Sequence, residues 1–394
     1  MKIVWCFWMR QRHLTKCGIK AFSTSFNTLV WIKFYLNDFK MLPIRTVVER
    51  EQSAWATIYA SVPQGSILGP LLFLVFINDI VADIHSDIYL FADDTSLTHT
   101  IEQERPEIGF NNLHEDLIKL ATWASRWHVK FNPEKTKYVV FSHHHKILYP
   151  NLCMNNQPRS RVSSHKHLGL TLDENIKWNE HLGSITTKRK KIIGTIWKLG
   201  RLIPRYCQHN YYASYIRPRL EYACVCFDNI SLHQVNPLEH IQRRAALACT
   251  HVYQKNVQQS FNELGWPTLQ QRRYYHQLVM FCKMVSGSAP NYLHVLISPT
   301  KGILSPRYAT RSSHHLQLHL ARTTSYRRSF ISSTTQIIWN LLDTPIKKAP
   351  TICAYKNKLK CNLSLSRRNR RYDLAYGIKD GHGSECAKGP TLWL

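Results

Sequence analysis

The stretch IYLFADDTSLTHT, residues 88–100, decides how the first half of the chain folds. An apolar run, Ile88 to Ala92, leads into the adjacent acids Asp93 and Asp94, and a polar–apolar run follows. This pattern predicts a β-hairpin with both aspartates at its tip. There the two carboxylates could converge and bind Mg²⁺, a hard cation that takes one or two carboxylates together with phosphate oxygens and water. The alternative is a solvated turn, where aspartate is common because its side chain caps backbone amides.

The charge of the whole chain indicates a polyanionic partner. The 394 residues include 52 Lys and Arg against 25 Asp and Glu, which gives a formal net charge of +27. Nucleic acid is the commonest polyanion that such proteins bind. A ribosomal-type or membrane-surface protein is the alternative, but 11 Trp and 19 Tyr are unusual for either class. The hydrophobic content of 44% favours a folded protein over a disordered one.

Cysteine and histidine do not form a recognisable metal motif. The 11 cysteines include no C-x-x-C pair, and the spacing of Cys224 and Cys226 does not suit a tetrahedral zinc site. We interpret His143 to His145 as a solvated loop. We find neither a secretory signal nor an apolar run of membrane-spanning length. The expectation is an intracellular protein with reduced thiols, in the nucleus or the cytoplasm, and without membrane contact.

The spacing of apolar residues predicts an α+β first half and a mostly helical second half. A helix is expected to open near Pro70 and a long amphipathic helix after Pro106. Strands are expected at 138–141 and around Leu170, with helices from Asn179 onward. One of these helices should present a basic face, which would hold nucleic-acid phosphates or be an ordinary solvated surface. The residues of that face are Lys188, Arg189, Lys190 and Lys191.

Several motifs, in order along the chain, resemble the reverse transcriptases of non-LTR retrotransposons. They are SVPQGSILGPLLF (61–73), FADD (91–94), KFNPEKTKYVVF (130–141) and HLGLTLDENIKW (167–178). The similarity continues through RPRLEYACVCF (217–227) and LEHIQRRA (238–245) to about Lys360.

The resemblance implies an RNA-directed DNA polymerase, which is a nucleotidyltransferase. Its expected fold is α+β: a partial polymerase palm, built as an antiparallel sheet with packed helices, precedes a mostly α-helical thumb-like and C-terminal region. The implied parts are a divergent N-terminal segment (1–27), the partial palm (28–178), a thumb-like helical region (179–230), a helical C-terminal region (231–360) and a basic, disordered tail (361–394).

The resemblance also implies a role for particular residues. Asp93 and Asp94 would be catalytic residues and ligands of a two-metal Mg²⁺ site, acting on an RNA template, a DNA primer and a deoxynucleoside triphosphate. Lys135 would lie near the pyrophosphate leaving group or be an ordinary surface lysine. The remaining implied contacts to nucleotide or nucleic acid are Pro63, Gln64, Gly65, Ser66 and Gly169. Gly65 would let the backbone approach a base pair where a Cβ would intrude.

One part of the family's site has no counterpart in the sequence. The family carries a third carboxylate on a strand before these motifs, whereas Met1 to Asn37 contains neither Asp nor Glu. The fingers strands and the endonuclease of such elements are not recognisable either. We therefore expect an N-terminally truncated reverse transcriptase that is inactive alone. The alternative is a non-catalytic, basic nucleic-acid-binding remnant, and a phosphoryl-transfer enzyme outside this family is a third hypothesis.

Overall fold

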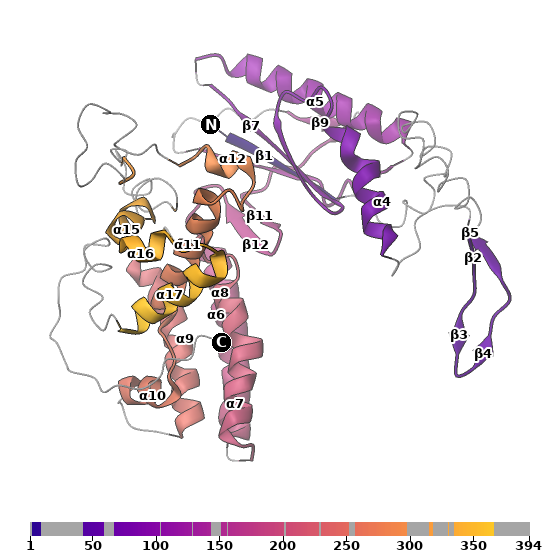
Figure 1. The fold of residues 1–394 in the computed structure, drawn as a ribbon. Helices are drawn as coiled ribbons and strands as arrows, with labels where there is room; N and C mark the ends of the chain where they lie inside the picture. The colour runs from indigo at the N-terminus through magenta and orange to yellow at the C-terminus, as the bar shows by residue number, and fades with distance from the viewer. Residues whose placement is uncertain are drawn as a thin grey trace. The chain divides into compact units, whose positions relative to one another are not determined.

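The chain folds into two compact units, Met1–Lys177 and Trp178–Leu394, which are drawn in Figure 1. The computed structural model describes residues 2–8, 42–58, 67–102, 104–127, 129–142, 151–155, 157–200, 202–227, 230–251, 257–297, 315–317, 330 and 335–365. All strands of this described part lie in the first unit, and the described elements of the second unit are helices. The predicted α+β fold is confirmed.

A four-stranded antiparallel sheet forms the centre of the first unit. Its strand order is β6-β7-β1-β8. The strands are β1 (Lys2–Trp8), β6 (Asp87–Phe91), β7 (Asp94–Thr100) and β8 (Lys137–Phe141). The strand predicted at 138–141 is thus confirmed as β8. The placement of β1 was not expected, because the sequence assigned residues 1–27 to a segment outside the palm, and β1 is instead an inner strand of the sheet.

The hairpin predicted around the two aspartates is confirmed. Phe91 of β6 pairs with Asp94 of β7, so Ala92 and Asp93 form a two-residue turn. Ala92 has a φ of 50°, whereas Asp93 is not among the residues with positive φ. A positive φ at only the first central residue matches a type II′ turn, whose twist suits a hairpin. Since Ala92 carries a Cβ, its left-handed backbone conformation is strained.

The strain at Ala92 leads to a stability prediction. Ala92→Val is expected to lower the free energy of unfolding by about 1–2 kcal/mol, because a β-branched side chain tolerates positive φ poorly. Ala92→Gly should stay within about 0.5 kcal/mol of wild type, because relief of strain offsets the added freedom of the unfolded chain. Urea denaturation followed by circular dichroism measures both. Equal stability of the valine and glycine variants would contradict the strained turn.

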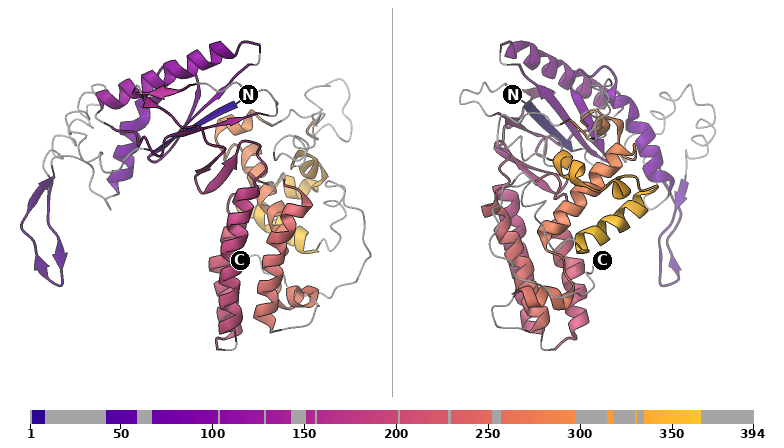
Figure 2. Two further views of the ribbon diagram at one scale, coloured as in Figure 1. Left: turned by 180° about the vertical axis from the view of Figure 1, so that it is seen from behind. Right: turned by 60° about the vertical axis from the view of Figure 1, so that its left-hand side comes forward.

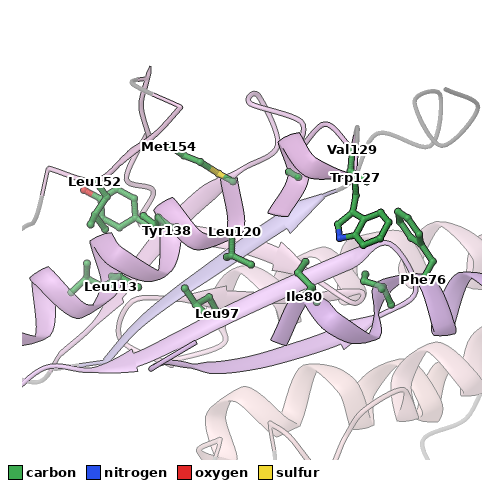
Figure 3. Close-up of a cluster of buried hydrophobic side chains, with 14 of the residues drawn as sticks. Phe76, Ile80, Leu97, Leu113, Leu120, Trp127, Val129, Tyr138, Leu152 and Met154 are labelled. Carbon is green, nitrogen blue, oxygen red and sulfur yellow. The ribbon is translucent and has the colours of Figure 1, made fainter. Parts of the chain in front are cut away.

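One apolar cluster packs helices against a face of this sheet (Figure 3). The helices are α4 (Leu68–Ile77), the 3₁₀ turn η2 (Asn78–Val81) and α5 (Pro106–Arg126). Leu113, Leu117 and Leu120 recur along α5 at helical spacing and are fully buried. They meet Leu97 of β7 and Phe76 of α4, and the ring of Phe76 lies edge-on to Trp127 at 5.9 Å between centroids. The acidic hairpin therefore packs on the helix predicted near Pro70, as expected.

Shorter antiparallel pairs account for the other described strands. They are β2 (Leu42–Ile44) with β5 (Ala56–Ile58), β3 (Val47–Val48) with β4 (Glu51–Gln52), β9 (Cys153–Met154) with β10 (Gln157–Pro158), and β11 (Ser164–His167) with β12 (Leu170–Asp173). The strand expected around Leu170 is confirmed as β12. Leu168 lies in the turn before it.

The second unit is built from helices, and α6 lies beside α9 in both Figure 1 and Figure 2. Its elements are α6 (Asn179–Leu199), α7 (Arg205–Tyr211), the π-helical turn η3 (Tyr212–Ile216), α8 (Arg217–Glu221), α9 (Leu232–Thr250), α10 (Val257–Leu264), α11 (Leu269–Val285), α12 (Asn291–His294), α15 (Thr335–Leu341), α16 (Thr344–Lys347) and α17 (Ile352–Leu365). A second core joins Phe281 of α11, Trp339 of α15 and Tyr355 of α17.

The last described helix extends beyond the predicted start of the tail. Helix α17 continues to Leu365, past the predicted tail boundary at residue 360, and residues 366–394 lie outside the described part. None of the described helices combines the length and the apolar character needed to cross a membrane.

Candidate functional site

Three strands of the main sheet meet at the acidic turn. Because β1 runs antiparallel to both neighbours, its last residue, Trp8, lies opposite Asp94 at the start of β7. On its other side, Cys6 of β1 lies opposite Lys137 at the start of β8. The turn that holds Lys135 immediately precedes β8. The register therefore brings Asp94, the end of β1 and the Lys135 turn to the same end of the sheet.

The two aspartates differ in their surroundings. Asp93 lies in the turn, and Asp94 is half-buried as the first residue of β7. Burial raises the pKa of Asp94, the adjacent Asp93 raises it further, and Lys135 partly opposes both. Asp94 Oδ1 is buried and accepts no hydrogen bond within the described part of the chain. A buried carboxylate oxygen without a donor, next to a second carboxylate, is a feature that a cation would satisfy.

The turn before β8 holds Lys135 in place. Asn132 Oδ1 accepts hydrogen bonds from the backbone amides of Glu134 at 3.0 Å and Lys135 at 3.3 Å. The Thr136 hydroxyl donates to the Asn132 carbonyl at 2.6 Å. Asparagine suits this position because its side chain caps the amides of a tight turn. Lys135 is exposed yet close enough to Asp94 to affect its pKa, so a cation lies at the acidic end of the sheet.

The carboxylates at the turn fit one divalent cation but not a complete two-metal site. Asp93 and Asp94 supply hard oxygen ligands, which Mg²⁺ accepts together with water and phosphate oxygens. Within the described residues, no group of three or more His, Cys, Asp or Glu side chains is arranged to hold a metal ion. Strand β1, the one beside the hairpin, has the sequence KIVWCFW and offers no carboxylate. A ligand from a second strand is therefore missing at this position.

Some predicted contacts are outside the described part or have a structural explanation. Pro63, Gln64, Gly65 and Ser66 lie outside the described residues. Gly169 lies in the two-residue turn between β11 and β12, where Leu168 has a φ of 45° and Gly169 a φ of 84°. Two positive φ values are typical of a type I′ turn, for which glycine is the favoured second residue. The turn geometry alone thus explains why residue 169 is a glycine. Contact of Gly169 with nucleic acid stays a prediction.

The four basic residues expected on one face of α6 do not share a face. Lys188, Lys190 and Lys191 are exposed, but Arg189 lies on the packed side of the helix. The Arg189 guanidinium donates from Nη1 to the Tyr215 carbonyl at 2.9 Å, and burial lowers its pKa. Four consecutive residues span most of a helix circumference, so at least one must face the neighbouring elements.

Helix α9 adds cations that the sequence analysis did not select. Burial lowers the pKa of His240, and Arg244, Lys190 and Arg243 lower it further in that order. Lys190 comes from α6 and the two arginines from α9, so the helices jointly form the α6–α9 basic cluster: Lys190, His240, Arg243 and Arg244. The adjacent arginines within LEHIQRRA can be seen in the sequence and indicate a basic patch on this helix. Their proximity to Lys190 depends on helix pairing, which the sequence does not show.

Comparison with known proteins finds a family match that includes the acidic hairpin. The family model described as reverse transcriptase (RNA-dependent DNA polymerase) matches residues 8–172. The RNA-directed DNA polymerase from mobile element jockey of Drosophila melanogaster is 27% identical over 208 residues, covering 50% of this chain and 22% of the relative. The probable RNA-directed DNA polymerase from transposon BS of the same species is 29% identical over 234 residues, covering 56% of this chain and 25% of the relative. Residues 8–172 are a reverse transcriptase domain of the non-LTR retrotransposon type.

The reverse transcriptase domain contains the acidic hairpin, α4, α5 and β8, and its match begins at Trp8, the residue opposite Asp94. The family resemblance stated from the motifs is thereby confirmed. Enzymes of this family use divalent metal ions. The chain spans about a quarter of the length of the two relatives, 22% and 25%.

Proposed function

We propose that the reverse transcriptase domain binds an RNA–DNA primer–template, that Asp93 and Asp94 are its metal ligands, and that it needs a further carboxylate to extend the primer. The observation that carries the proposal is the pairing of β1 with β7. Asp93 and Asp94 are adjacent at the tip of the hairpin, but the neighbouring strand has Trp8 opposite Asp94 and no acid along its length.

The residues at the acidic end have distinct roles in this proposal. Asp93 and Asp94 would hold Mg²⁺, which would neutralise phosphate charge on the incoming deoxynucleoside triphosphate. Lys135 adds a positive charge close to Asp94 and so favours a triphosphate there. The α6–α9 basic cluster contributes sequence-independent attraction to the nucleic-acid backbone.

Without a further carboxylate, the domain is proposed to bind nucleic acid but not to catalyse primer extension. Phosphoryl transfer with two metals requires ligands that fix both ions against the attacking and the leaving oxygens. A single hairpin with two carboxylates supports only part of that arrangement. The chain is thus proposed to bind its nucleic acid without extending it. A purely nucleic-acid-binding protein is the second candidate, favoured by the same acid-free β1.

The binding half of the proposal predicts a steep salt dependence. Affinity for a labelled RNA–DNA hybrid is expected to fall by about 10³-fold or more between about 50 and 200 mM salt, with little preference for sequence. Fluorescence anisotropy at increasing salt measures it. An affinity that stays constant over this range would contradict backbone binding, because phosphate contacts release counterions.

A triple variant tests whether the α6–α9 basic cluster makes these contacts. Lys190→Gln, Arg243→Gln and Arg244→Gln together should reduce the slope of log affinity against log salt by about 2, since each phosphate contact contributes about 0.7–0.9. The matched control removes three charges from α17 through Lys356→Gln, Lys358→Gln and Lys360→Gln. Equal losses in both triple variants would mean that bulk charge, and not this cluster, attracts the nucleic acid.

A further inference from the structure

The second unit contains a cavity that the polymerase proposal does not use. It lies among η3, α8, α9 and α11 and has a volume of about 250 Å³, including the solvent at its mouth. Its enclosed part is about the size of one water molecule. The lining residues are His209, Tyr212, Arg217, Gln242, Trp266, Pro267 and Arg272.

Tyr212 brings an unsatisfied hydroxyl to this cavity. The side chain is 1% exposed and its ring stacks on Trp266 with 4.0 Å between centroids. The hydroxyl makes no hydrogen bond within the described residues. Gln242 is close by and lowers the pKa of the hydroxyl slightly, while its own amide donates to the Pro267 carbonyl and accepts from the Leu269 amide, both at 2.9 Å. Burial raises the pKa of Tyr212, so the hydroxyl remains protonated and can donate.

Arg272 brings a second free donor. Its side chain is 8% exposed, and it forms a two-point ion pair in which Nε and Nη2 donate to the carboxylate of Glu221. Glu221 also lies 3.3 Å from His276 Nε2, so both of its oxygens have partners. The third nitrogen of the guanidinium, Nη1, is buried and has no hydrogen-bond partner in the described part of the chain.

The charges around the cavity do not balance. Arg217 and Arg272 both line it, while Glu221 is the carboxylate that interacts with both of them. Burial lowers the pKa of Arg217 and the nearby Arg272 lowers it further, although Glu221 partly opposes this. Buried polar groups in folded proteins are normally hydrogen-bonded. Two buried donors without a geometric hydrogen bond, beside an excess of positive charge, are features that an anion would satisfy.

We propose that this cavity binds one phosphate group. One of its oxygens enters the enclosed part and accepts hydrogen bonds from the Tyr212 hydroxyl and Arg272 Nη1, while Arg217 neutralises the group from the cavity wall. Phosphate fits because it offers several acceptor oxygens to guanidinium donors. The group could belong to a nucleic-acid backbone or to a free phosphate compound, and the first source rests on the proposed function.

Titration of inorganic phosphate into the full chain at low ionic strength, followed by calorimetry, tests the site. Tyr212→Phe removes the hydroxyl and keeps the ring that stacks on Trp266. It should weaken phosphate binding about tenfold or more, because a hydrogen bond to a charged group is lost. Arg217→Gln should weaken it as well. The matched control is Arg205→Gln, which removes the same charge from an exposed ion pair with Glu263 and should bind phosphate as wild type does.

Thermal melting separates loss of the site from loss of the fold. Without phosphate, Tyr212→Phe should melt at or above the temperature of the wild type, because an unsatisfied buried hydroxyl has been removed. With phosphate, wild type should melt higher, and Tyr212→Phe should show a smaller upward shift at the same phosphate concentration. Absence of phosphate binding, or equal binding by wild type and Tyr212→Phe, would overturn the proposal.

Competition with an RNA–DNA hybrid identifies the source of the group. If the hybrid displaces phosphate from wild type, the site takes a backbone phosphate. If both bind together, the site takes a free phosphate compound, and the phosphate proposal stands. These measurements do not depend on the acidic hairpin, so their failure would leave the salt-dependent binding and the primer-extension assay unaffected.

Discussion

Asp116→Ala is expected to lower the free energy of unfolding by about 3–5 kcal/mol, the largest stability effect we predict. The Asp116 side chain is fully buried on α5. Its carboxylate accepts hydrogen bonds from the Ser86 hydroxyl at 2.5 Å, from the Ser86 amide at 2.9 Å and from the His85 amide at 2.9 Å. Alanine would leave these donors unsatisfied where α5 meets the segment before β6, and each buried unpaired group costs about 1–3 kcal/mol.

Chemical denaturation measures this effect, with Glu115→Ala as the matched control. Glu115 is the preceding residue of α5 and is exposed, so its loss should change the free energy of unfolding by about 0.5 kcal/mol or less. If Asp116→Ala were as mild as Glu115→Ala, the carboxylate would not be anchoring this segment.

The same carboxylate predicts a pH dependence. Burial alone would raise the pKa of Asp116, but hydrogen bonds from Ser86 and His85 lower it below its ordinary value. A lowered folded-state pKa contributes stability above the unfolded pKa of about 3.9, and this stability is lost as the pH falls through the folded pKa. Wild type should therefore lose stability on acidification below about pH 4 more steeply than Asp116→Ala.

Local patterns predicted the parts of the fold that local interactions form. The hairpin at Asp93 follows from a turn between apolar and alternating runs, and α5 follows from leucines at helical spacing. The resemblance to reverse transcriptases then suggested a metal-binding role for Asp93 and Asp94, whose position at the hairpin tip was already predicted. These features were accessible because each depends on a few consecutive residues.

The remaining features depend on contacts between segments that are far apart in the sequence, so local patterns did not predict them. Lys2–Trp8 becomes an inner strand only by pairing with 94–100 and 137–141, and nothing within its own residues specifies those partners. Asp116 occupies the apolar stripe of α5 three residues after Leu113, which is a detectable irregularity, but its donors lie about 30 residues earlier. The phosphate cavity draws Tyr212, Gln242 and Arg272 from three elements, so sequence spacing gives no indication of it.

Primer extension by this chain alone is expected to remain at the level of an Asp93→Ala control. The assay is extension of a primed poly(rA) template with Mg²⁺ and deoxythymidine triphosphate. Loss of ligands that fix the second metal should remove several kcal/mol of transition-state stabilisation, or about 10³-fold or more in rate. Wild-type extension that Asp93→Ala abolishes would prove this wrong, because a further acid would then be completing the site. Both proteins should still bind the RNA–DNA hybrid, which shows that the comparison concerns chemistry and not folding.

A carboxylate introduced on β1 tests whether the missing ligand is the main deficit. Trp8 is the appropriate position because it lies opposite Asp94, and directly opposed residues of an antiparallel pair lie on one face of the sheet. Trp8→Asp is therefore expected to give Mg²⁺-dependent extension above wild type, which Asp93→Ala in the same protein should abolish. The control Trp8→Asn changes size similarly without adding a charge and should stay at background. If Trp8→Asp folds, binds the hybrid and still fails to extend, one carboxylate is not the deficit, and the nucleic-acid-binding function is the better description of the chain.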